Sequence, residues 1–155
     1  MYNPKKTSLM KKLLFLLLSV FTLQTAWADN DKVITVNQLP AKAQTFIQQN
    51  FPSEKVAFAK MEKELFDTSY DVMFVNGNSV EFDKNGEWTD LKCKHSAVPS
   101  KAVPAQITKF VTDNHAGAKI LQLERDKYSY EVKLSNLWEI KFDTKFNVID
   151  MDMDD

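Results

Sequence analysis

The chain has 155 residues, with 20 basic side chains, 21 acidic side chains and one cysteine. Removal of the N-terminal export segment described below takes away four lysines, which leaves 16 basic and 21 acidic side chains and a net charge of −5. This mildly acidic balance argues against nucleic acid and anionic membranes as partners, because both require clustered Lys and Arg. A single cysteine permits no intramolecular disulfide, so an apolar core must hold the fold together.

The first 28 residues have the pattern of a secretory signal. Lys11 and Lys12 precede an apolar run over residues 13–21, and Ala26-Trp27-Ala28 places small residues where signal peptidase cleaves. The run is much shorter than the roughly 20 apolar residues that span a bilayer. The sequence therefore predicts cleavage after Ala28, a periplasmic location and no stable membrane insertion after cleavage.

A short strand, a helix and a meander are predicted next along the chain. Residues 31–37 alternate as an extra edge strand would, and Pro40 then opens a helix at a position that needs no backbone donor. Ala43, Phe46 and Ile47 follow with the spacing of an apolar helical stripe. Four strands are expected after this helix, because apolar residues alternate with period two from about residue 55 onward.

Two turns separate these strands. Asn76-Gly77 supplies the positive φ values of a tight hairpin. Residues 83–86 (Asp-Lys-Asn-Gly) place an Asp first, where its carboxylate can accept backbone hydrogen bonds, and a Gly last, where positive φ is common. The turn over residues 83–86 is therefore scaffold rather than chemistry.

The same order of elements occurs twice. Residues 39–56 align with residues 103–120, and residues 70–83 align with residues 130–143. We therefore predict an α+β fold of two tandem units, each an N-terminal helix packed on a four-stranded antiparallel meander sheet. The predicted boundaries are residues 1–28 for the signal peptide, 29–94 for the first unit, 95–103 for the linker and 104–155 for the second unit.

The second unit departs from the first at its turns. Leu137 and Phe146 stand where the first unit has Gly77 and Gly86. We expect Asn147, rather than Phe146, to take the left-handed backbone conformation at the second of these turns, because Asn tolerates positive φ better than an aromatic residue.

These motifs resemble the PepSY-like family of periplasmic proteins, which are described as similar in fold to the β-lactamase inhibitory protein. The resemblance covers about residues 33–152, and its motif residues are Pro40, Tyr70, Val72, Gly77, Phe82, Asp83, Gly86, Trp88, Pro104, Tyr130, Val132, Phe142 and Asp143. It implies tandem α/β units, export to the periplasm of a Gram-negative cell, and a binding or inhibitory role such as the restraint of a peptidase. It does not imply inhibition of a β-lactamase, because inhibitor contacts lie in surface loops that a shared fold does not transfer.

A catalytic centre is not expected. Cys93 and His95 would share a face if both lay on one strand, but no third residue completes a nucleophilic or metal site with them. Asp83 and Asp143 are explained by their turns, and no phosphate-binding or dinucleotide motif is present. We therefore predict no cofactor, no metal and no enzymatic activity, with an enzyme centred on Cys93 as the less favoured alternative.

Three apolar residues depart from the expected pattern and are candidates for partner binding. Met73 and Val75 lie opposite the helix side of their strand, where the second unit has Lys133 and Ser135. Either the two units touch at Met73 and Val75 or a partner does, and Trp138 is either the edge of the core or an exposed anchor. The sequence thus favours an exported, non-catalytic binding module that inhibits or modulates a periplasmic protein or peptidase, with a small-ligand carrier as the alternative.

Overall fold

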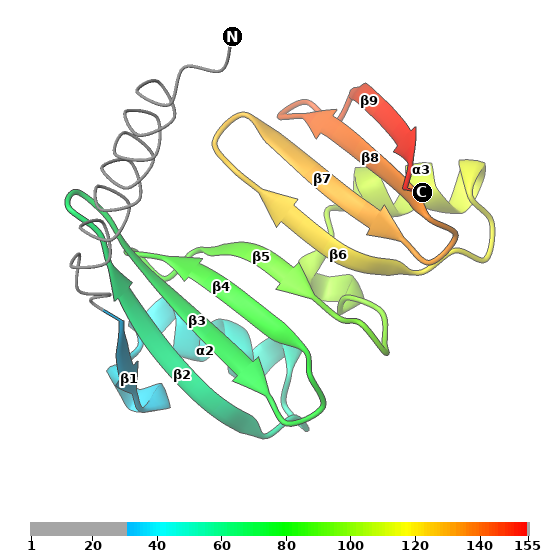
Figure 1. Cartoon of the computed structure of the whole chain (residues 1–155). Helices are drawn as coiled ribbons and strands as arrows, with labels where there is room; N and C mark the ends of the chain where they lie inside the picture. The colour runs from blue at the N-terminus through cyan, green and yellow to red at the C-terminus, as the bar shows by residue number, and fades with distance from the viewer. Residues whose placement is uncertain (1–30, 155) are drawn as a thin grey trace, which may run out of the picture. The chain divides into compact units, whose positions relative to one another are not determined.

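Nine antiparallel strands in chain order form one sheet in the computed structural model, which describes residues 31–154 (Figure 1). Residues 31–155 make one compact unit, and the predicted signal segment lies outside the described residues. The strands are β1 (Lys32–Ile34), β2 (Val56–Lys63), β3 (Thr68–Phe74), β4 (Ser79–Asp83), β5 (Trp88–Lys92), β6 (Ile120–Arg125), β7 (Ser129–Leu134), β8 (Trp138–Asp143) and β9 (Val148–Met153). The helices are α2 (Ala41–Asn50) and α3 (Ala105–Asn114), with short 3-10 turns at Val36–Gln38 and Ser100–Ala102.

Both helices lie behind the sheet in Figure 1 and cover the same face of it. Ala43 and Ile47 are the buried residues of α2, and Ile107 and Val111 are those of α3. Residues four apart lie on one side of a helix, so each helix presents a single apolar stripe to the sheet. The two predicted helices, and the edge strand predicted within residues 31–37, are confirmed.

Aromatic side chains fill the layer between helices and sheet. The ring of Phe46 on α2 meets Phe82 edge-on with centroids 5.8 Å apart, and the ring of Phe110 on α3 meets Phe142 in the same way at 5.4 Å. Both Phe82 and Phe142 are fully buried. Burial of each such side chain contributes about 2–3 kcal/mol to folding.

The predicted pair of separate four-stranded sheets is wrong. Four strands do follow each helix, but β5 and β6 pair antiparallel, with Leu91 opposite Leu123 and Asp90 opposite Glu124. A sheet that stopped at β5 would leave a row of backbone N–H and C=O groups without partners. Pairing with β6 satisfies these groups and buries Leu91 against Leu123, so the two halves of the chain share one sheet.

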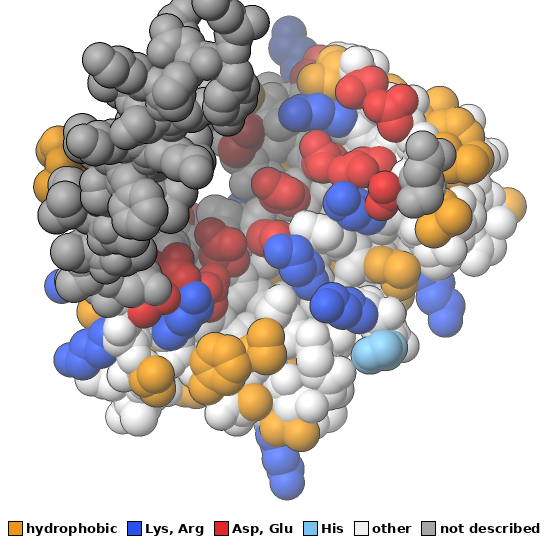
Figure 2. Space-filling view, in the orientation of Figure 1, with side chains coloured by type: hydrophobic (Ala, Val, Ile, Leu, Met, Phe, Trp, Pro, Cys, Tyr) orange, Lys and Arg blue, Asp and Glu red, His pale blue; other side chains and the backbone are white. Residues whose placement is uncertain are grey.

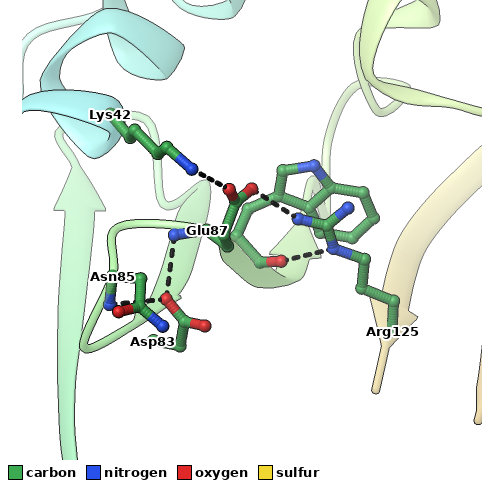
Figure 3. Close-up of polar contacts among 6 residues, drawn as sticks. Lys42, Asp83, Asn85, Glu87 and Arg125 are labelled. Carbon is green, nitrogen blue, oxygen red and sulfur yellow. Dashed lines mark hydrogen bonds and ion pairs between the residues drawn. The ribbon is translucent and has the colours of Figure 1, made fainter. Parts of the chain in front are cut away.

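A network of side chains joins the two halves beside this β5–β6 junction (Figure 3). Arg125 donates from Nε to the backbone oxygen of Trp88 (2.7 Å), and its guanidinium lies 4.0 Å from the centroid of the Trp88 ring. Glu87 accepts from Arg125 (3.3 Å) and from Lys42 on α2 (2.5 Å), and the Lys42 hydrogen bond is the main cause that lowers the pKa of Glu87. The contacts of Lys42, Glu87 and Arg125 thus connect helix α2, the turn before β5 and strand β6.

The turn before β5 has the predicted geometry. Asp83 Oδ1 accepts hydrogen bonds from the backbone N–H groups of Asn85 (2.8 Å) and Glu87 (2.9 Å), and Gly86 has a φ of 78°. Gly86 also lies against the start of α2, since a Cβ at this position would be 2.8 Å from the Cβ of Pro40. Glycine is required here both by conformation and by space.

The expectation for the second such turn is wrong. Phe146 itself has the positive φ, 64°, and Leu137 has a φ of 70° at the preceding hairpin. Asn147 stays out of the left-handed region, and both its backbone N–H and its side-chain amide donate to Asp143 at 2.9 Å. The ring of Phe146 packs on Tyr130 with centroids 5.3 Å apart, which offsets the cost of the unusual backbone.

Candidate binding face of the sheet

One face of the sheet carries no helix. Successive residues of a strand point to opposite faces, so the side chains between the buried ones point away from α2 and α3. Figure 2 shows this face, on which acidic side chains form a band with basic side chains beside it. We call it the open face.

Five carboxylates lie directly opposite one another across five neighbouring strands of the open face. Asp71 on β3 pairs with Glu81 on β4, Glu81 with Asp90 on β5, Asp90 with Glu124 on β6, and Glu124 with Glu131 on β7. We call these five residues the acidic row. Neighbouring strands are about 4.8 Å apart, and like charges placed directly opposite are destabilising.

Lysines neutralise only part of the acidic row. Lys60 lies 3.2 Å from Asp71, Lys92 lies 2.7 Å from Asp90, and Lys141 lies 3.8 Å from Glu131. Within residues 31–154, neither Glu81 nor Glu124 has a basic side-chain nitrogen within 4.0 Å. Lys92 acts on Glu81 and Glu124 only over a longer distance, so the five carboxylates of the row exceed the three lysines beside them.

The repulsion and partial burial in the row shift its protonation. Burial is the first cause that raises the pKa of Glu81, followed by the negative charges of Asp71 and Asp90. Burial also raises the pKa of Asp71, and a hydrogen bond with Glu139 is the main cause that raises the pKa of Glu131. For Asp71, Glu81 and Glu131, the raised pKa means that the charged form is less favoured than in water.

Three depressions follow one another across the open face. The first, of about 330 Å³, combines the partly exposed Phe58 and Met73 with Lys60, Lys92 and three members of the acidic row. The second, of about 490 Å³, includes Lys92 and Lys133 of the open face and extends at the β7–β8 turn to Leu137 and to Trp138, whose ring lies on the helix side of the sheet. The third, of about 220 Å³, is lined by Glu131, Glu139, Lys141, Asp150 and Asp152. The face thus offers apolar, mixed and acidic surface in turn.

The three residues predicted for partner binding lie in different places. Met73 is on the open face next to the acidic row, and Val75, 70% exposed, follows the end of β3 outside the first depression. Trp138 lines the second depression and lies against His115 with ring centroids 5.5 Å apart. The two halves of the chain meet through β5 and β6 rather than through Met73 and Val75.

Sequence reasoning missed the acidic row. Its members come from five strands, and each one looks like an ordinary solvent-facing acid within its own strand. One pattern in the sequence could have predicted its members: an acidic residue between two apolar residues that face the core, as in Val80-Glu81-Phe82 and Tyr130-Glu131-Val132. The registers that align these residues could not be read from the sequence.

Cys93 does not have the surroundings of a catalytic nucleophile. Strand β5 ends at Lys92, and the structure buries Cys93 in the core while it leaves His95 exposed. Burial, together with the negative charge of Glu54, raises the pKa of the Cys93 thiol to about 11. The thiolate is the reactive form of cysteine, so this thiol is unreactive near neutral pH.

Neither a cluster of metal ligands nor a membrane-spanning helix occurs within residues 31–154. Among residues 31–154, no three His, Cys, Asp or Glu side chains are grouped so that they could hold a metal ion. Within the same range, neither helix has the length and apolar character needed to cross a bilayer.

Comparison with known proteins identifies the family. Residues 20–65 and 68–150 match the model of the family described as beta-lactamase-inhibitor-like, PepSY-like. The chain belongs to this PepSY-like family, as its motif residues indicated. No curated protein is a significant match to the chain.

Three solved structures of Bacteroides proteins share the fold. A periplasmic protein of Bacteroides vulgatus is 62% identical, with a TM-score of 0.79 over 81% of this chain and 98% of that chain. A Bacteroides thetaiotaomicron protein described as calcium-regulated and periplasmic is 56% identical, with a TM-score of 0.78 over 79% and 97% of the two chains. A second Bacteroides vulgatus periplasmic protein, of unknown function, is 38% identical, with a TM-score of 0.75 over 79% and 99%. The protein is periplasmic, as predicted, and none of these three descriptions assigns a catalytic or inhibitory activity.

Proposed function

We propose that this protein is a non-catalytic binding module. Its open face holds a periplasmic protein or peptide by binding the basic side chains of that partner. The observation that carries the proposal is the acidic row, because five directly opposed carboxylates oppose folding and no helix covers them. Proteins depart from local stability rules mainly at functional sites. Lys or Arg side chains of a partner would convert the repulsion within the row into attraction between the two proteins.

Apolar surface beside the row supplies the second part of such an interface. Phe58 and Met73 lie across from each other on β2 and β3 and are both partly exposed. Interfaces commonly combine aromatic and Met side chains with a charged surround. We propose Met73 as a direct contact of the partner, with Val75 and Trp138 at the margins of the same surface.

The family supports a protein as the partner. Its description is inhibitor-like, which makes inhibition or modulation of a periplasmic protein or peptidase the specific form of the proposal. The buried Cys93 thiol, with its raised pKa, supports a role in binding rather than in nucleophilic catalysis.

Affinity capture with matched variants tests the proposal. Immobilised mature protein would be exposed to periplasmic extract with crosslinking, next to the double variant Glu81→Gln/Glu124→Gln. The control Glu64→Gln/Asp113→Asn removes the same charge at the β2–β3 connection and on α3, away from the open face. We expect the wild type and the control to capture the same partner, and the double variant of the row to capture roughly tenfold less of it.

Measuring capture at different ionic strengths and with added Ca²⁺ gives a further test. Capture should weaken as ionic strength rises from about 0.05 M to about 0.5 M, because screening shortens the reach of the row. One relative is described as calcium-regulated, so capture is repeated with about 1 mM Ca²⁺, and its loss would show that calcium and partner binding are coupled. Equal recovery by the wild type and the row variant, or no recovery above background, would contradict the proposal.

A further inference from the structure

Strand β9 differs from the other strands of the sheet. Each of the strands β1 to β8 has at least one buried residue, whereas all six residues of β9 are exposed. Val148, Ile149, Met151 and Met153 are apolar and are between 38% and 57% exposed. In the described part of the chain β9 pairs with β8 alone, so one of its edges is open.

The corresponding strand of the first half has a neighbour on both sides. Strand β5 is the fourth strand after α2, as β9 is the fourth strand after α3. The outer edge of β5 is occupied by β6 through antiparallel pairing. The edge that β6 fills on β5 is the edge that stays open on β9 (Figure 1).

The backbone of β9 is set to receive a strand. The N–H of Asp154 donates to the backbone oxygen of Leu137 (2.7 Å), so the backbone groups of Asp154 point toward β8. Backbone groups alternate in direction along an antiparallel strand, so those of Met151 and Met153 face away from β8. The N–H of Met151 is accordingly bonded to the side chain of Asp150 (3.0 Å) instead of to β8.

The two faces of β9 have different chemistry. Asp150 and Asp152 lie opposite Lys141 and Glu139 on the open face, in the acidic depression of about 220 Å³. Met151 and Met153 lie opposite Ile140 and Trp138 on the face that carries the helices. A strand added at this edge would therefore place alternate side chains next to carboxylates and next to apolar groups.

We propose that β9 accepts an extended segment of a partner protein in which basic and apolar residues alternate. Such a segment would pair with the outward backbone groups of Met151 and Met153, set its Lys or Arg side chains beside Asp150 and Asp152, and cover the exposed methionines. This inference deepens the proposed function, on which it rests, by naming the form in which part of a basic partner is held.

A second copy of the chain fits this edge poorly. Antiparallel pairing of β9 with its own copy would put Asp150 and Asp152 of both copies on the same face of the joined sheet. Like charges on adjacent strands repel each other, and edge acids are a known means of preventing self-association. Charge complementarity thus selects a basic segment over a second copy.

A synthetic peptide of about ten residues with alternating Val and Lys is the probe. It would be titrated into the mature, isotope-labelled protein while the backbone amide signals are followed. We expect the signals of Met151 and Met153 to shift and their hydrogen exchange to slow. A peptide with Glu in place of Lys should not bind.

Variants of the protein separate the edge from the acidic row. Met151→Pro removes an N–H that faces away from β8, so the pairing of β9 with β8 loses no hydrogen bond. The peptide does lose a donor, and we expect its binding to weaken at least tenfold. Met151→Thr keeps the N–H and should bind within about twofold of the wild type, as should Glu81→Gln/Glu124→Gln. A peptide with the same charges but N-methylated at its Val residues loses the N–H groups that would face Met151 and Met153, so it should not bind the wild type, whereas a peptide N-methylated at its Lys residues keeps that edge and should bind. This pair of peptides gives a test that does not depend on the folding of any variant.

Three results would overturn the inference. Shifts confined to the acidic row, with full binding to Met151→Pro, would place the peptide on the open face and leave the proposed function standing. Equal binding of the peptide N-methylated at its Val residues would exclude the proposed strand pairing. A dimer in solution that Met151→Pro dissolves would make a second copy the occupant of the edge.

Discussion

The first half of the chain (residues 39–93) and the second half (residues 103–153) have the same order of elements but use different residues at the positive-φ positions of their turns. Gly77 and Gly86 take positive φ in the first half, while Leu137 and Phe146 take it in the second. The difference shows that the left-handed backbone is imposed by the hairpins themselves. The second half accepts a cost of about 1–2 kcal/mol at each of these residues and offsets it by contacts such as that of Phe146 with Tyr130.

The halves also differ in how their last strands are used. Strand β5 is buried between β4 and β6, whereas β9 has an open edge and no buried residue. The same kind of strand is thus part of the core in one half and exposed surface in the other. Three predictions follow from this comparison, and they concern stability.

The largest expected effect comes from the core of either half. Phe82→Ala and Phe142→Ala should each lower the free energy of unfolding by about 3–5 kcal/mol, because each leaves a cavity under a helix. Since β5 and β6 join the halves in one sheet, either change should accelerate hydrogen exchange in β3 and β7 alike, and urea unfolding should stay a single transition.

Phe58→Ala is the matched control, because Phe58 is partly exposed on the open face and should cost less than about 1 kcal/mol. A variant in which only the mutated half loses protection would show that the two halves fold independently despite the shared sheet.

Turn glycines should give the next largest effect. Gly86→Ala should lower the free energy of unfolding by about 2–4 kcal/mol, since Ala is strained at a φ of 78° and its Cβ would lie 2.8 Å from that of Pro40. Gly77→Ala carries only the conformational cost, about 1 kcal/mol, because nothing lies within 4 Å of its Cβ. Urea denaturation measures both, and equal losses would disprove the close approach of the turn to α2.

The smallest effect tests repulsion in the acidic row. Burial and the neighbouring carboxylates raise the pKa of Glu81 in the folded protein, so the folded state binds a proton more readily than the unfolded state. The contribution of Glu81 to stability should therefore fall as pH rises from the ordinary Glu pKa through the raised value. Glu81→Gln should be more stable than the wild type by about 0.5 kcal/mol at pH 7, and this gain should vanish below about pH 4.

Glu64→Gln serves as the comparison, since Glu64 is exposed in the connection between β2 and β3. This variant removes one negative charge outside the acidic row. A Glu81→Gln variant that is less stable than the wild type at pH 7 would show that the row is not repulsive.

Much of the fold could be predicted from local patterns. The apolar stripe of Ala43 and Ile47 predicted α2, and the alternation around Val72 and Phe74 predicted β3. The turn that begins at Asp83 was also predicted correctly. Each of these features depends on residues that are only a few positions apart in the sequence. The family also followed from such motifs. The conformation of Phe146 could not be predicted, because the contact with Tyr130 that offsets its cost joins residues on different strands.

The candidate site was largely hidden from the sequence. Met73 was marked by its apolar character on the solvent side of β3, and this position lies on the open face. The acidic row was not marked, because Asp90 and Glu124 become neighbours only through the register between β5 and β6.

By itself, the sequence determined the elements, their order and the family, since helical stripes, strand alternation and turn residues act over short distances along the chain. The tertiary structure alone decided that β5 pairs with β6 to make one sheet, that five carboxylates from five strands stand in line, and that β9 keeps an open edge. The physical reason is that hydrogen bonds between strand edges depend on which edges meet and in which register. That choice is made by burial and pairing over the whole sheet rather than by any single segment.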